Sequence, residues 1–205
     1  MSLNNGVLIV IEGIDGAGKS TQARLLLKKL RSEGYPAVYF REPTKGKWGR
    51  EIKKLAKRAD SLSPEEELAL FIKDREENVK KNLRPAISRK KVVILDRYYF
   101  STIAYQGAKG IRQALIRKLH KRFAVEPDLV FILDIDPAEG LERIQARKEK
   151  DLLFERKDYL ASVRRIFRSF RGRAFVQLKA ARPRMEVHRD IALRVQAFLR
   201  PRIRR

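Results

Sequence analysis

The chain has 205 residues, which is long enough for one α/β domain and too short for two. With 43% apolar residues it can bury a substantial core. It contains no cysteine, which excludes a disulfide framework, a thiolate metal site and a cysteine nucleophile. Lys and Arg number 48 against 25 Asp and Glu, so the chain is strongly basic, with a net charge of +23.

Short apolar segments rich in β-branched residues alternate with segments whose apolar residues recur at helical spacing. The predicted strands are residues 7–11, 37–40, 92–95, 129–133 and 174–178. The first predicted helix follows the glycine loop and ends at Gly34. Further helices are predicted at about 49–59 and 64–89, from about 137, and at about 157–170 and 187–199. This alternation predicts an α/β fold with a doubly wound, five-stranded parallel sheet and helices on both faces, in one domain spanning residues 1–205.

The first strand leads directly into the segment Gly13-x4-Gly18-Lys19-Ser20, and a helix follows. This spacing, in this context, is that of a P-loop, whose backbone N–H groups and helix N-terminus cradle phosphates. It predicts binding of ATP with Mg²⁺ and places the chain in the P-loop NTPase class. The expected ATP-binding residues are Gly13, Gly16, Ala17, Gly18, Lys19, Ser20 and Thr21.

A P-loop metal site needs a second acidic group, and two strands end in candidates. We expect the Ser20 hydroxyl and Asp96 to hold Mg²⁺, because Arg97 adds an anion-binding group beside Asp96. Asp134 and Asp136 are the alternative, although Asp134 could equally cap the helix that begins near Pro137. His120 and His188 lie in basic helical surroundings and are expected to be surface residues, so no hydrolytic triad is predicted.

Further motifs follow the P-loop in the chain: Arg41-Glu42-Pro43, Phe71-x3-Arg75, Asp96-Arg97-Tyr98, Ser101-x3-Tyr105-Gln106, Pro127-Asp128-Leu129 and Phe154-Glu155. Their order resembles that of the thymidylate kinase family over about residues 7–200. The resemblance implies phosphorylation of dTMP to dTDP with ATP–Mg²⁺, and also a homodimer. Another P-loop nucleotide or deoxynucleoside kinase, or a nucleic-acid-associated NTPase, remains the alternative.

The resemblance also assigns roles to residues. Phe71 and Arg75, four apart on one helix face, would stack on thymine and donate to its carbonyl edge, with Thr102 and Gln106 on the same base. Arg97 would grip the acceptor phosphate, and Arg41 and Glu42 would shape the pocket. Asp15 would meet the 3′-hydroxyl of the acceptor, and Tyr105 would crowd a 2′-hydroxyl. Lys53 occupies a position that is often arginine in bacterial relatives, and Phe154 and Glu155 complete the expected acceptor residues.

The chain departs from the family in its catalytic arginine. Relatives place one at the position of Gly16 or just before the aromatic–Glu pair, where this chain has Leu153. We expect Arg147 to supply this charge from a mobile lid at about residues 147–156. With Lys19, Arg97 and Asp15, it completes the predicted catalytic set.

The basic charge is concentrated near the C-terminus, where residues 161–205 hold fourteen basic and two acidic side chains. Such a segment indicates either a nucleic-acid partner or a solvated basic surface. We favour the surface because no aromatic platform alternates with the basic residues. The longest apolar run is far shorter than the ~20 residues that span a bilayer, and no basic leader precedes it, so we expect a cytoplasmic protein without a membrane partner.

Overall fold

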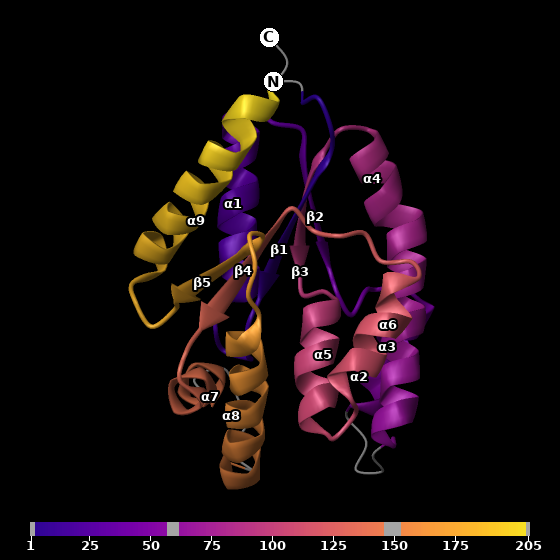
Figure 1. The fold of residues 1–205 in the computed structure, drawn as a ribbon. Helices are drawn as coiled ribbons and strands as arrows, with labels where there is room; N and C mark the ends of the chain where they lie inside the picture. Colours follow the sequence, from indigo (N-terminus) through magenta and orange to yellow (C-terminus); the bar gives the residue numbers. More distant parts are fainter. Residues whose placement is uncertain (1–2, 57–61, 146–152, 204–205) are drawn as a thin grey trace.

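The computed structural model describes residues 3–56, 62–145 and 153–203, drawn in Figure 1. A five-stranded sheet forms the centre, with the strand order β2-β3-β1-β4-β5 and every neighbouring pair parallel. The strands are β1 (Val7–Glu12), β2 (Ala37–Arg41), β3 (Val92–Asp96), β4 (Leu129–Asp134) and β5 (Phe175–Lys179). The predicted doubly wound, parallel α/β fold is confirmed.

Burial explains why the apolar segments became the inner strands. Every residue of β1 and β3 is buried, as expected for strands covered by helices on both faces. The edge strand β5 has only half-buried and exposed residues. The register pairs Ile11 with Asp96 and Glu12 with Ile132. The strands β1 and β3 therefore end within one residue of each other, and β4 continues two residues further.

Helices connect the strands and cover the sheet. The α-helices are α1 (Lys19–Ser32), α2 (Lys47–Leu55), α3 (Pro64–Asn78), α4 (Arg84–Ser88), α5 (Tyr99–Ala108), α6 (Gln113–Lys121), α7 (Pro137–Gln145), α8 (Leu153–Ser169) and α9 (Arg184–Leu199), with a π-helical turn η1 (Val79–Leu83) and a 3-10 turn η2 (Arg200–Arg202). In Figure 1, α1 and α9 pack together on one side of the sheet, α4 lies on the other side against β3, and α5 and α8 lie below the strands. None of the helices in these ranges has the length and apolar character needed to cross a membrane.

The predicted helix over 64–89 is interrupted. Its start is as expected, since Ser63 and Glu66 form a capping box. The turn η1 then separates α3 from α4. Pro85 accounts for the break, because it donates no backbone hydrogen bond and its ring crowds the carbonyl of Lys81. The helices α5 and α6 were not predicted from the periodicity of the sequence.

The parallel topology determines where a site can form. The loops that follow β1, β2, β3 and β4 all leave the same edge of the sheet, the lower edge in Figure 1. Ligands of open α/β sheets bind at this edge, where the carboxyl ends of the strands meet. Leu3 and Ile203, the first and last described residues, bridge to each other at the opposite edge.

Candidate active site

The glycine loop after β1 has the backbone of a phosphate cradle. Gly13, Gly16 and Gly18 have φ values of 140°, 81° and 87°, a region that favours glycine. A Cβ on Gly16 would lie 2.1 Å from the Gly140 carbonyl oxygen, so this position admits no side chain without a shift of α7. Because α1 begins at Lys19, its unpaired N–H groups are directed at the loop.

Lys19 lies at the base of this loop and is only 7% exposed. Its Nζ donates to the carbonyl oxygen of Ile14 at 2.7 Å. Burial lowers the pKa of Lys19 to about 7, and the nearby Arg97 guanidinium adds to the effect. An anionic ligand beside Nζ would raise the pKa of Lys19 again and so favour its charged form.

Asp96, at the end of β3, lies against the first turn of α1. Its Oδ2 accepts hydrogen bonds from the Ser20 hydroxyl and, at 3.1 Å, from the Tyr39 hydroxyl. Its Oδ1 is buried and has no hydrogen-bond partner among the described residues. A hydroxyl beside a carboxylate oxygen that lacks a partner is a donor set suited to Mg²⁺.

The alternative acidic pair, Asp134 at the end of β4 and Asp136 just beyond it, already forms ion pairs with Arg164. Arg164 Nε lies 2.6 Å from Asp134 Oδ1, and Arg164 Nη1 lies 3.0 Å from Asp136 Oδ2. Asp136, not Asp134, accepts from the backbone N–H of Ala138 at the start of α7. The geometry therefore favours Asp96 over this pair as the metal-binding carboxylate.

A cavity of about 790 Å³ opens above the loop, large enough for a nucleoside triphosphate. It is lined by residues 15–22 and by the side chains of Arg41, Arg97 and Arg143. Arg143 is held in place by Glu139, at 2.6 Å, and by the carbonyl oxygen of Ala180, at 3.2 Å. Arg147, the predicted lid arginine, lies outside the described residues, as does most of the predicted lid.

A second cavity of about 320 Å³ adjoins the first, and Asp15, Arg41 and Arg97 line both. Ten of the twelve predicted acceptor residues line it: Asp15, Arg41, Glu42, Lys53, Phe71, Arg75, Arg97, Thr102, Tyr105 and Gln106. Phe154 and Glu155 belong to the first turn of α8, where no side chain is described. Predicted residues up to 91 positions apart in sequence, from Asp15 to Gln106, thus surround one space the size of a nucleotide, called the acceptor cavity below.

Arg75 forms the buried wall of the acceptor cavity and is 1% exposed. Its Nε lies 2.6 Å from Glu42 Oε2, and its Nη1 lies 2.8 Å from Thr102 Oγ1. Nη1 is also 2.7 Å from Nε2 of His120. Its remaining nitrogen, Nη2, has no hydrogen bond to a described residue, and Arg75 lines the acceptor cavity.

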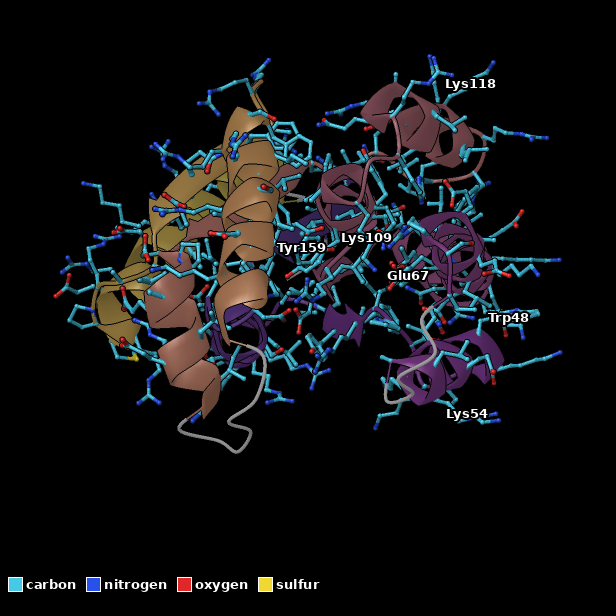
Figure 2. The ribbon with its side chains drawn as sticks, turned by 90° about the horizontal axis from the view of Figure 1, so that it is seen from below. Trp48, Lys54, Glu67, Lys109, Lys118 and Tyr159 are labelled. Carbon is cyan, nitrogen blue, oxygen red and sulfur yellow. The ribbon has the colours of Figure 1, made fainter. Side chains whose placement is uncertain are left out.

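Gln106 offers the complementary group. Its Nε2 donates to Glu67 Oε2 at 3.1 Å, while its buried Oε1 has no partner among the described residues. Glu67 also pairs with Lys109, and Figure 2 shows these two side chains facing each other between α3 and α5. The cavity therefore presents a donor on Arg75 and an acceptor on Gln106. Glu67 was not predicted, because its partners are about forty positions away in sequence.

Arg97 stands where the two cavities meet, and its backbone has a φ of 69°. Its guanidinium pairs with the Asp15 carboxylate, which also accepts from the Tyr105 hydroxyl at 3.1 Å. Figure 2 shows Tyr159 on α8. Its hydroxyl donates to the Tyr105 carbonyl oxygen at 2.9 Å, and Tyr159 also lines the acceptor cavity. Tyr159 was also missed, because an isolated tyrosine on a helix gives no sequence signal.

Glu12, the last residue of β1, fixes the start of α5. Its carboxylate accepts from the backbone N–H of Tyr98 at 2.8 Å and from the Ser101 hydroxyl at 2.6 Å. Complete burial raises the pKa of Glu12 to about 7. The contact holds the segment that carries Arg97 against the phosphate loop.

The expectation that both histidines are surface residues is wrong. His120 is 1% exposed and His188 is 8% exposed. His120 turns inward because Arg75 and the Ile116 carbonyl oxygen satisfy both ring nitrogens. His188 is buried in α9, which packs against α1.

The fold and the two joined cavities define a P-loop NTPase of the nucleotide-kinase type. The family model for thymidylate kinase matches residues 11–191. Three similar proteins are a probable thymidylate kinase of Archaeoglobus fulgidus (42% identity, covering 94% of this chain and 96% of that protein), a thymidylate kinase of Brachyspira hyodysenteriae (48%, 80% and 81%) and one of Desulfotalea psychrophila (41%, 98% and 99%). The chain belongs to the thymidylate kinase family, as its motifs predicted.

Proposed function

We propose that this protein transfers the γ-phosphoryl group of ATP to dTMP, giving ADP and dTDP. The observation that carries the proposal is the acceptor cavity beside the phosphate loop, with three residues shared between the two spaces. Phosphoryl transfer needs both anions in line and close together, which adjoining cavities allow. The family membership supports the same reaction.

The chemistry of the acceptor cavity fits a thymine base. Thymine presents a carbonyl acceptor and a ring N–H donor, which match Arg75 Nη2 and Gln106 Oε1. Cytosine presents an amine and an unprotonated ring nitrogen at the same positions, so it would leave buried groups unpaired. Phe71, half-buried on the cavity wall, offers its ring for stacking.

The other predicted residues divide the rest of the nucleotide among them. We assign the acceptor phosphate to Arg97, with Arg41 and Lys53 nearby, and the 3′-hydroxyl to Asp15. Tyr105, held by its bond to Asp15, would crowd a 2′-hydroxyl and so favour deoxyribose. Phe154 and Glu155 are proposed to complete the acceptor site.

The donor half of the reaction relies on the loop. Residues Gly13, Gly16, Ala17, Gly18 and Thr21 would bind the ATP phosphates through backbone and hydroxyl groups, and Lys19 would offset the charge on the transferred group. Ser20 and Asp96 would hold Mg²⁺. When bound, Mg²⁺ supplies positive charge beside the phosphate oxygens.

A further positive charge is needed where the group moves. Gly16 cannot be replaced by a larger residue without displacing α7, which supports a source other than the loop. We propose Arg147, on a mobile lid at 147–156, for this role. We also propose that the protein is a cytoplasmic homodimer, and light scattering would measure its mass.

A panel of acceptors tests the proposed function. ADP formation from ATP and Mg²⁺ is measured with dTMP, dUMP, dCMP, dAMP, dGMP and the ribonucleotide of thymine. The Lys19→Met variant serves as a blank. We expect dTMP to be the preferred acceptor, dUMP to be weak and dCMP to give a rate near the blank. Equal rates with all acceptors, or ATP hydrolysis independent of any acceptor, would contradict the proposal.

A further inference from the structure

His120, on α6, contacts Arg75 from the side away from the acceptor cavity. Its Nε2 lies 2.7 Å from Arg75 Nη1, and its Nδ1 lies 2.7 Å from the Ile116 carbonyl oxygen. The ring stacks on Tyr99 with centroids 5.7 Å apart and planes inclined by 26°. Both nitrogens and one ring face are therefore fixed by neighbours.

These contacts determine the tautomer of His120. A carbonyl oxygen only accepts hydrogen bonds, so Nδ1 must carry the proton. The guanidinium of Arg75 only donates, so Nε2 must be the unprotonated acceptor. Burial, with the charge of Arg75, lowers the pKa of His120 to about 3, so the ring stays neutral at every working pH.

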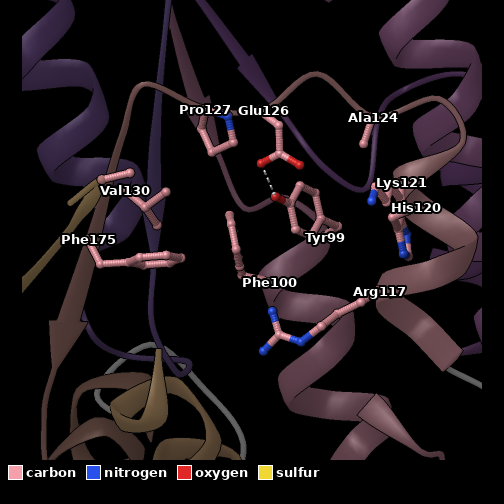
Figure 3. A pocket seen from close by; sticks show the side chains of 11 residues that line it. Tyr99, Phe100, Arg117, His120, Lys121, Ala124, Glu126, Pro127, Val130 and Phe175 are labelled. Carbon is pink, nitrogen blue, oxygen red and sulfur yellow. Dashed lines mark hydrogen bonds between the residues drawn. The ribbon is translucent and has the colours of Figure 1, made fainter. Parts of the chain in front are cut away.

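His120 differs from the other two partners of Arg75 in where it lies. Glu42 and Thr102 line the acceptor cavity, whereas His120 lines a separate cavity of about 260 Å³. Figure 3 shows this 260 Å³ cavity, which Arg117, Lys121 and Glu126 also line. The Tyr99 hydroxyl is bonded there to Glu126 at 3.1 Å. His120 is thus placed to act on a nucleotide through Arg75 and not by contact.

We propose that His120 is a positioning residue for acceptor recognition: as a neutral hydrogen-bond acceptor it fixes the guanidinium plane of Arg75 so that Nη2 faces the base. The inference rests on the proposed function, because it takes Arg75 as the base reader. Glu42 holds Nε, and Thr102 with His120 occupies both N–H groups of Nη1. Without His120, Arg75 keeps its charge, its ion pair with Glu42 and its hydrogen bond to Thr102. One N–H group of Nη1 then loses its acceptor, so the guanidinium plane is held by two contacts in place of three.

Two substitutions separate this role from simple packing. His120→Phe keeps a ring against Tyr99 and removes the acceptor, whereas His120→Gln places an amide oxygen near the position of Nε2. The glutamine side chain occupies no more volume than the imidazole, so it fits the space that His120 fills. His188→Phe is the matched control, because His188 is also buried in a helix but does not contact Arg75.

Steady-state kinetics with dTMP and ATP, and a thermal melt, are measured for all three variants. We expect His120→Phe to raise KM for dTMP about tenfold or more, the loss of one hydrogen bond to a charged group, with KM for ATP unchanged. His120→Gln should restore most of that loss, and His188→Phe should lower Tm without changing KM for dTMP. An unchanged KM for dTMP in His120→Phe, or equal impairment of the Phe and Gln variants, would overturn the inference.

A second measurement needs no variant of His120. The ¹⁵N shifts of the two histidines, assigned with His188→Gln, should show a proton on Nδ1 of His120 and an acceptor at Nε2. Adding dTMP should move the Nε2 resonance, and adding a non-hydrolysable ATP analogue should not. A resonance indifferent to dTMP would refute the inference even if His120→Phe fails to fold. If the unmodified protein does not use dTMP at all, the proposed function fails first, and the two failures are distinguished.

Discussion

Lys19 should take up a proton when ATP binds. Its pKa is lowered to about 7 by burial, so at pH 8 roughly nine-tenths of the unliganded protein holds a neutral lysine. A triphosphate beside Nζ favours the charged form and raises this pKa again. Binding of ATP–Mg²⁺ should therefore take up about 0.9 proton at pH 8, about half a proton at pH 7 and little at pH 6.

Calorimetry measures this uptake. The binding enthalpy of a non-hydrolysable ATP analogue is determined at pH 8 in buffers of different ionisation enthalpy, and the slope gives the number of protons. Glu12 also has a pKa of about 7 and is coupled electrostatically to Lys19, so the Lys19→Met variant supplies the baseline. A slope near zero in the unmodified protein, or the same slope in Lys19→Met, would show that Lys19 is already charged and that the argument is wrong.

Three further predictions follow from other contacts. Asp96→Asn removes the buried negative charge beside Ser20, so the Mg²⁺ concentration for half-maximal activity should rise about tenfold or more, and an unchanged Mg²⁺ titration would count against Asp96 as a ligand. Tyr105→Ala opens the space beside Asp15, so the ratio of kcat/KM for dTMP over its ribonucleotide should fall about tenfold, and a constant ratio would exclude the steric role. The pKa of His120 is about 3 in the folded protein and near 6.5 in the unfolded chain, so below pH 6.5 only the unfolded chain binds the extra proton. Between pH 7 and pH 5 the unmodified protein should therefore lose about 2 kcal/mol more stability than His120→Gln, measured by urea melts. Parallel losses in both proteins would contradict that assignment.

Sequence reasoning worked best where the signal is local. The strand before Gly13 and the helix after Ser20 identified the phosphate loop, and the apolar segments placed all five strands within about one residue of their observed bounds. The resemblance then supplied a set of acceptor residues, ten of which line one cavity.

What the sequence did not reveal depends on contacts between distant elements. His120 lies among Lys118, Lys121 and Arg122, a pattern typical of a surface, yet Arg75 from α3 holds it inside. The orientation of the Gln106 amide depends on Glu67 in the same way. Hydrophobic periodicity contains no information about such pairs, because a buried polar residue needs a partner that only the tertiary fold supplies.

Product analysis from a mixture of acceptors tests the central claim most directly. Equimolar dTMP, dCMP, dAMP, dGMP and the ribonucleotide of thymine compete for limiting ATP–Mg²⁺. The diphosphates formed are separated by chromatography against standards, because dGDP and ADP have the same mass. The structure predicts dTDP as the dominant nucleoside diphosphate besides ADP, formed in a one-to-one ratio with ADP. A mixture of diphosphates in proportion to the acceptors supplied, or ADP without a matching diphosphate, would contradict it.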